Sequence, residues 1–134
     1  MQVGFAIGRI IVGLFYLFTG VSGLLNLNMM AGYAASKGVP APMLAVIVSH
    51  LLLLLAAVCI FTGWKPVIGV AALVIFYLPV TFMMHNFWAM PDPTMKMTNM
   101  IMFMKNMALM GSALMFLRIP DWRWGARGGA APPI

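Results

Sequence analysis

Residues 85–110 read HNFWAMPDPTMKMTNMIMFMKNMALM, and the rest of the chain is organised around them. This stretch closes one apolar segment at His85, turns through Pro91-Asp92-Pro93, and opens a second apolar segment that contains Lys105. Its polar side chains fall at a depth where lipid excludes most such groups. Ionisable groups inside a membrane are costly, so they usually mark a functional site or a contact with a partner. We therefore expect a functional site on this stretch.

The composition indicates an integral membrane protein. The 134 residues are 63% hydrophobic and 7% charged, with a mean hydropathy of +1.01, whereas soluble domains carry about 25% charged residues. The net charge of +6 does not point to nucleic acid, because the basic residues are scattered at segment ends and form no single stripe. We expect the chain to contact the lipid bilayer, in a bacterial or archaeal plasma membrane. The single cysteine, Cys59, fits a small buried apolar residue.

Four segments are apolar and long enough to cross a bilayer at about 1.5 Å per helical residue. They run over about 3–25, 43–62, 67–87 and 98–117. The first lacks a basic flank and a cleavage site, so we expect it to be retained as a span. A short interfacial helix is predicted at about 29–36. The fold class is therefore all-α: a membrane-spanning antiparallel four-helix bundle over residues 1–118, followed by an interfacial, partly mobile tail over 119–134.

The basic residues predict the orientation of this bundle. The side that holds both termini carries Lys65, Arg118, Arg123 and Arg127, with Arg9 near the end of the first span. The opposite side carries Lys37 and Lys96 with Asp92. Because cytoplasmic loops are richer in Lys and Arg, the N- and C-termini are both predicted to be cytoplasmic.

Helical spacing predicts three faces within the spans. In the first span, one face is formed by Arg9, Gly13, Tyr16, Gly20 and Gly23, at i+3 and i+4 steps. Its small residues would let a neighbouring helix approach closely. In the third span, Tyr77, Thr81 and His85 form a polar stripe. In the fourth, Lys105, Ala108 and Ser112 share a face, so the lysine is predicted to point at a helix interface and away from lipid.

The candidate site is a polar group of side chains, most of them predicted to lie toward the outer leaflet. Its members are His50, Tyr77, Thr81, His85, Asn86, Trp88, Lys105 and Asn106, with Arg9 as a separate contact at the inner leaflet. Such residues can bind a quinone head group, an anion or the carboxylate of a partner. The alternative interpretation is interfacial anchoring, with Lys105 extending toward the headgroups and Trp88 in an aromatic belt. No residue is assigned a catalytic role.

Two metal-based interpretations remain as alternatives. His50 and His85 are possible axial ligands of a haem, although nothing else in the sequence prepares a haem pocket. The thioethers of Met97, Met100 and Met104 are possible ligands of Cu(I). Methionines go round the fourth span on all sides, so we favour apolar filling over a metal site. No carboxylate lies inside a span, and no cofactor is assigned, with a quinone as the candidate.

Several short motifs connect the sequence to a known family. They are Arg9, Phe18-Thr19-Gly20-Val21-Ser22, Gly38-Val39-Pro40, His85-Asn86-Phe87-Trp88 and the stretch from Met102 to Leu109. In this arrangement the chain resembles the DoxX family of small four-span membrane proteins, over roughly Ile7 to Leu117. The family usually has a lysine where Gly23 stands and a glutamate where Leu53 stands. Losing both charges together leaves no unpaired buried charge, and His50, one turn outward of Leu53, is expected to take over part of the polar role.

The resemblance implies a redox setting. Family members are associated with quinone-linked sulfur oxidation, as the membrane subunit of thiosulfate:quinone oxidoreductase, and with membrane-anchored redox complexes. We therefore expect an accessory subunit that docks to a larger membrane redox or electron-transfer complex beside a quinone, with no self-contained catalytic site. The alternatives are the quinone-reducing subunit of a thiosulfate:quinone oxidoreductase-type enzyme, and a carrier of a small solute or copper.

Overall fold

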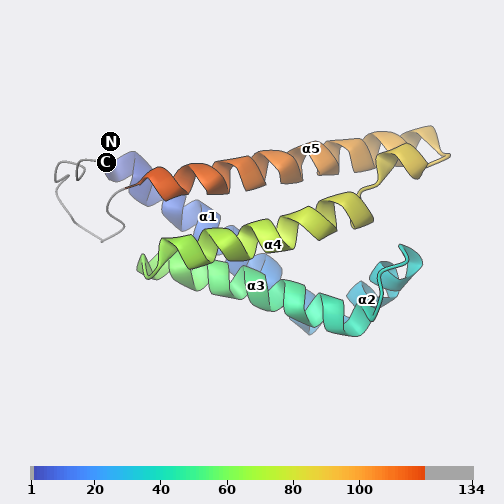
Figure 1. Ribbon diagram of the computed structural model, residues 1–134, viewed down its shortest axis with the longest axis horizontal. Coiled ribbons are helices and arrows are strands. Elements are labelled where there is room, and N and C mark those ends of the chain that lie inside the picture. The colour runs from blue at the N-terminus through green and yellow to red at the C-terminus, as the bar shows by residue number, and fades with distance from the viewer. Residues whose placement is uncertain (1, 120–134) are drawn as a thin grey trace.

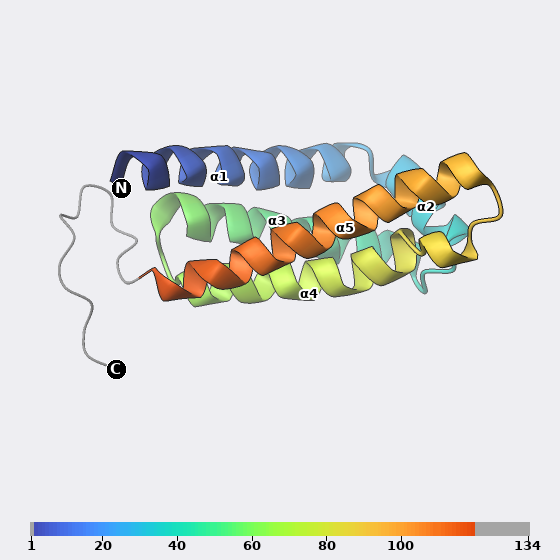
Figure 2. The same cartoon turned by 90° about the horizontal axis from the view of Figure 1, so that it is seen from above.

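A computed structural model describes residues 2–119 of the chain, and over this range the structure is helical with no strand (Figures 1 and 2). The helices are α1 (Gln2–Leu25), α2 (Leu27–Ser36), α3 (Pro42–Thr62), α4 (Pro66–Met84) and α5 (Pro93–Met115), with short 3₁₀ turns η1 (Phe87–Ala89) and η2 (Phe116–Arg118). Four segments of this range are long and apolar enough to cross a membrane: α1, α3, α4 with η1, and α5 with η2. The all-α prediction is confirmed, whereas the predicted tail from residue 120 onward lies outside the described residues.

Proline decides where three of the helices begin. Pro42, Pro66 and Pro93 each occupy the first turn, where the missing N–H costs nothing and the fixed φ suits a helix. At α5 the side chain of Asp92 also accepts a hydrogen bond from the backbone N–H of Met95 at 2.7 Å. The fourth spanning helix therefore begins five residues before its predicted start.

Helix α1 packs on α3 through one narrow face. The buried positions of α1 over residues 3–25 are Arg9, Gly13, Tyr16, Gly20 and Gly23, so the predicted face is confirmed. A Cβ atom built on Gly13 would lie 2.8 Å from the ring of Phe61, and one built on Gly20 would lie 2.7 Å from Leu54. The absent side chains thus allow α3 to approach closely, as small residues do between membrane helices.

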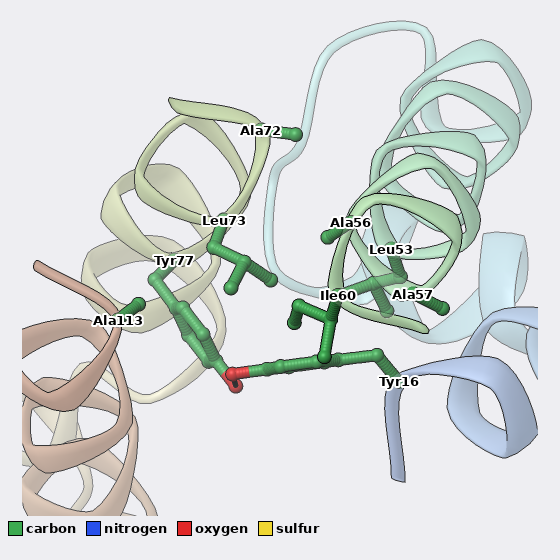
Figure 3. Packing of buried hydrophobic residues seen from close by; sticks show 9 residues of the cluster. All are labelled: Tyr16, Leu53, Ala56, Ala57, Ile60, Ala72, Leu73, Tyr77 and Ala113. Carbon is green, nitrogen blue, oxygen red and sulfur yellow. Dashed lines mark hydrogen bonds between the residues drawn. The ribbon is translucent and has the colours of Figure 1, made fainter. Parts of the chain in front are cut away.

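The apolar core joins four of the helices, α1, α3, α4 and α5 (Figure 3). It consists of Tyr16, Leu53, Ala56, Ala57, Ile60, Ala72, Leu73, Tyr77 and Ala113. At its centre the hydroxyl of Tyr77 donates a hydrogen bond to the hydroxyl of Tyr16 at 3.2 Å, which satisfies one polar group of each buried ring. Cys59 is buried beside this core, as predicted. A smaller cluster of Ala31, Ala34 and Val46 holds α2 against α3.

The four spans differ in how much of each the chain itself covers. In α3, the most apolar of them, 39% of the spanning window is buried, whereas in α5, the least apolar, the buried share is 11%. Lipid is the most apolar surrounding available, so a span left to lipid is expected to be the most apolar one. In this chain the buried share of a span rises with its apolarity, so the least apolar span is the most exposed one.

The face of α5 that carries Lys105, called its outer face below, is exposed. Lys105, Ala108 and Ser112 do share a face, but all three are exposed, and the buried side chains of α5 are Asn106 and Ala113. Lys105 is exposed among residues 2–119, so the helix interface predicted for it is not formed within this part of the chain. One residue in a helix corresponds to a turn of about 100°, so Asn106 faces the bundle while its neighbour Lys105 does not.

Candidate functional site

The candidate site is a cavity of about 300 Å³ between α1, α2, α3 and α4, beneath the short helix α2. It brings together two of the predicted site residues, His50 of α3 and His85 at the end of α4. Thr19, Tyr33 and Ser49 add hydroxyl groups to its wall, and the remaining lining side chains are apolar. A mostly apolar cavity with a few polar groups is typical of a site for a small organic ligand.

The hydrogen bonds of His50 fix its tautomer. Its Nδ1 lies 2.7 Å from the backbone carbonyl oxygen of Val46 and 3.2 Å from the hydroxyl oxygen of Ser49. That hydroxyl itself donates to the same carbonyl at 2.9 Å. A carbonyl oxygen can only accept, so Nδ1 carries the proton and donates. In the neutral ring, Nε2 is therefore a hydrogen-bond acceptor.

His85 has the same tautomer for a similar reason. Its Nδ1 lies 3.3 Å from the side-chain oxygen of Asn99 on α5. The amide nitrogen of Asn99 donates to the carbonyl of Met95 at 2.9 Å, which turns the amide oxygen toward the imidazole. Nδ1 of His85 is thus the donor, and Nε2 of the neutral ring is an acceptor. The ring also lies within electrostatic range of two cations, Lys37 and Lys105.

Gly23 makes room for the imidazole of His50. A Cβ atom built on Gly23 would lie 1.8 Å from Nε2 and 1.9 Å from Cδ2 of that ring. The ring therefore occupies the space where a side chain of residue 23 would begin. The lysine that the family resemblance places at this position cannot coexist with His50 in its present place.

Two members of the predicted polar stripe, Tyr77 and Thr81, are buried in the bundle outside the cavity. They are 2% and 1% exposed. The hydroxyl of Thr81 and the amide oxygen of Asn86 are buried with no hydrogen-bond partner among residues 2–119. Asn106 is 7% exposed and lies on the buried side of α5. The two unsatisfied polar atoms, on Thr81 and Asn86, therefore belong to residues that do not line the cavity.

Trp88 belongs to an aromatic cluster that joins η1 to α5. The ring of Phe103 lies 5.3 Å from Phe82, 5.5 Å from Phe87 and 5.9 Å from Trp88, measured between centroids, all in edge-to-face arrangements. Such contacts stabilise a fold by about 0.5–1.5 kcal/mol each. The indole is 55% exposed and takes no part in the cavity. Lys105 is likewise exposed, and its amine donates to the sulfur of Met102 at 3.2 Å.

Arg9 lies at the other end of the molecule and binds the end of α3. It is 3% exposed, its Nε donates to the carbonyl of Ile60 at 2.5 Å, and its Nη2 donates to the carbonyl of Phe61 at 3.1 Å. The last carbonyls of a helix have no partner within it and carry partial negative charge, so a cation is favourable there. The ring of Phe5 lies 5.9 Å from the guanidinium carbon. The geometry gives Arg9 a structural role.

Sequence reasoning missed the residues that orient the two histidines. Asn99 and Ser49 have no motif around them, and Tyr33 enters the cavity from the interfacial helix. One signal for Asn99 was present: it and His85 are each seven residues from Asp92, the centre of the turn. Residues at equal distance from a tight helix–helix turn tend to face each other.

The residues proposed as metal ligands are the two histidines of the cavity and three methionines of α5. Among residues 2–119 no three His, Cys, Asp or Glu side chains come together in one place. Met97, Met100 and Met104 are exposed on α5, by 56%, 37% and 64%. The cavity that holds both histidines is at the lower end of the size range of ligand sites, roughly 300–1,000 Å³, which favours a single ring over a porphyrin.

Comparison with known proteins identifies the family. The chain matches the DoxX family over residues 4–86, which covers α1 to α4 and ends before α5. It is 34% identical over 112 residues to the inner membrane protein YphA of Escherichia coli (strain K12), a stretch that covers 81% of this chain and 77% of that protein. No solved structure matches. With its four apolar helices, the chain is an integral membrane protein, and it belongs to the DoxX family.

Proposed function

We propose that this DoxX family protein is an accessory subunit of a larger membrane redox complex, and that its cavity holds the ring of a quinone-type molecule. The cavity between His50 and His85 carries this proposal. Its apolar walls suit a flat ring, and its volume of about 300 Å³ suits a head group. The isoprenoid tail of such a molecule would leave the cavity for the surrounding lipid.

The tautomers of the two histidines select the redox form of the ring. Both present Nε2 as an acceptor, because each Nδ1 already donates within the chain. An oxidised quinone has two carbonyl oxygens and can only accept, whereas a quinol has two hydroxyl groups and can donate. We therefore propose that the reduced form binds more tightly. Two hydrogen bonds of about 1 kcal/mol each correspond to a preference of about tenfold or more.

Binding to the purified protein in lipid nanodiscs tests this proposal. The probes are decylubiquinol and decylubiquinone, titrated separately under anaerobic conditions. We expect the quinol to bind about tenfold more tightly, and the preference to fall in His50→Phe and His85→Phe, which keep a ring but remove the acceptors. Lys96→Gln, a change of an exposed side chain on α5, is the control. Absence of binding of both probes, or equal binding in the wild type and both histidine variants, would refute the proposal.

We also propose that the bundle is antiparallel, with both termini in the cytoplasm. Lys65 and the arginines from Arg118 onward would then face the cytoplasm, while Lys37 and Lys96 face outward, in keeping with the positive-inside rule. The native Cys59 is fully buried and gives little background labelling. A cysteine at Met95 should react with an impermeant maleimide from outside, and one at Trp64 only after permeabilisation; both positions are more than half exposed. The opposite labelling pattern would reverse the orientation.

A further inference from the structure

The outer face of α5 is exposed, although a span exposed to lipid is expected to be strongly apolar. α5 is the least apolar of the four spans and the one that the chain covers least. Gly111 on this face is open, since a Cβ built on it would meet no atom within 4 Å. Ala108 and Ser112 beside it are exposed and small. Small residues at an open helix surface allow the backbone of a second membrane helix to come close.

Lys105 adds a charge to this face. It lies twelve residues after Pro93 and ten before Met115, so its Cα is about 18 Å and about 15 Å from the two ends of α5. Among residues 2–119 the amine donates a hydrogen bond to the sulfur of Met102, which is a weak acceptor and carries no charge, and it lies within electrostatic range of His85. An ammonium group in a span is normally paired with an opposite charge or faces another protein segment.

Residues 2–119 place no carboxylate beside Lys105. The chain has two acidic residues, Asp92 and Asp121. Asp92 caps the start of α5, about 20 Å along the helix from Lys105 at 1.5 Å per residue, and Asp121 follows the end of the same helix in the sequence. Two copies that pack through this face would bring together lysines without a carboxylate. The complementary group is therefore expected on a different protein.

We infer that the face formed by Lys105, Ala108, Gly111 and Ser112 binds a transmembrane helix of another protein, and that this helix carries an Asp or Glu carboxylate at the level of Lys105. The inference rests on the accessory-subunit part of the proposed function and names its contact. The small residues provide the close approach, and the ion pair fixes the register between the two helices.

Photocrosslinking in the native membrane tests this inference. A benzophenone amino acid is placed at Ala108, with Ile75, an exposed residue near the middle of α4, as the control position. We expect a protein adduct from position 108 whose partner peptide lies in a span containing Asp or Glu. Its yield should fall at least tenfold in Lys105→Gln, and remain in Lys105→Arg and Lys96→Gln. Lys105→Glu combined with the partner's acid changed to Lys should restore the adduct.

Three outcomes would overturn the inference: adducts with lipid alone, adducts with a second copy of the chain, or a protein adduct that is unchanged in Lys105→Gln. The first would mean that the lysine reaches the headgroups by itself. Native electrophoresis of the gently solubilised wild type separates the two proposals. A complex that forms without crosslinks from position 108 keeps the accessory role and rejects this face, whereas migration of the chain alone rejects both. Decylubiquinol binding by Lys105→Gln tests the cavity independently.

Discussion

Two faces of this molecule have similar composition and opposite surroundings. The inner face of α1 combines one arginine, Arg9, with three glycines, and the outer face of α5 combines one lysine, Lys105, with Ala108, Gly111 and Ser112. On α1 each of these glycines is met by a side chain of α3, and the arginine donates to carbonyl groups of that helix. On α5 the face is open. A basic residue among small residues therefore indicates close helix contact, but the rest of the chain decides whether that contact is internal.

The largest loss of stability is expected at Gly23, on the α1 face that packs on α3. Gly23→Leu should lower the free energy of unfolding by about 3 kcal/mol, because the new Cβ would lie 1.8 Å from Nε2 of His50. Thermal unfolding in detergent, followed by circular dichroism, measures the change. Gly8→Leu is the matched control, since a Cβ there meets nothing within 4 Å. Equal losses in the two variants would mean that general disturbance of α1, and no specific contact, is responsible.

A smaller loss of stability is expected at the other end of the same α1 face, at Arg9. Arg9→Met should lower the free energy of unfolding by about 2 kcal/mol, because the carbonyls of Ile60 and Phe61 lose their donors inside the protein. The same unfolding assay applies, with Arg118→Met as the control at an exposed arginine. If Arg9→Met were as stable as the wild type, the two arginines would be equivalent and the capping role of Arg9 would be wrong.

A smaller loss of stability still is expected at Asn99, on the side of α5 that contacts His85. Asn99→Leu removes the acceptor of His85 Nδ1 and should lower the free energy of unfolding by about 1 kcal/mol. It should also reduce the preference for decylubiquinol over decylubiquinone, because the imidazole is no longer held in one tautomer. Asn28→Leu, at an exposed asparagine, serves as the control. A full preference in Asn99→Leu would show that Asn99 does not orient the histidine.

The smallest effect on stability is expected at the open face. Gly111→Leu should change the free energy of unfolding of the purified chain by less than about 0.5 kcal/mol, as at other open surface positions. In the native membrane the same variant should lower the crosslinking yield from position 108, because a bulky side chain now occupies the contact. A purified chain destabilised as strongly as by Gly23→Leu would show that the two faces are not different.

The faces of the helices were predictable to unequal degrees. In α1 the spacing of Arg9, Tyr16 and the glycines defined one face, since few other residues of that span are small or polar. In α5 the spacing also grouped Lys105 with Ala108 and Ser112, but it did not show that residues 2–119 leave this face open. Apolar methionine and leucine side chains surround α5 on every side, so no contrast in the sequence shows which side faces inward.

The cavity was less predictable than the helices that form it. Both histidines were expected to be part of a polar group, and symmetry about Asp92 could have paired His85 with Asn99. The cavity walls, however, come from four consecutive helices, with lining residues spread from Thr19 to His85. The fit between Gly23 and His50, 27 positions apart in the chain, depends on how closely α1 approaches α3. Such a distance is a property of packing and cannot be read from spacing along one helix.

The fit between Gly23 and His50 also constrains how this protein can change over generations. A mutation that gives residue 23 any side chain is harmful while the imidazole is in place, and becomes tolerable only after residue 50 has been replaced by something smaller. The order of the two mutations is therefore fixed, and a lineage with histidine at position 50 is confined to glycine at position 23. Relatives of this chain with histidine at position 50 should therefore all have glycine at position 23, whereas relatives with a smaller residue at position 50 should have either glycine or another residue there.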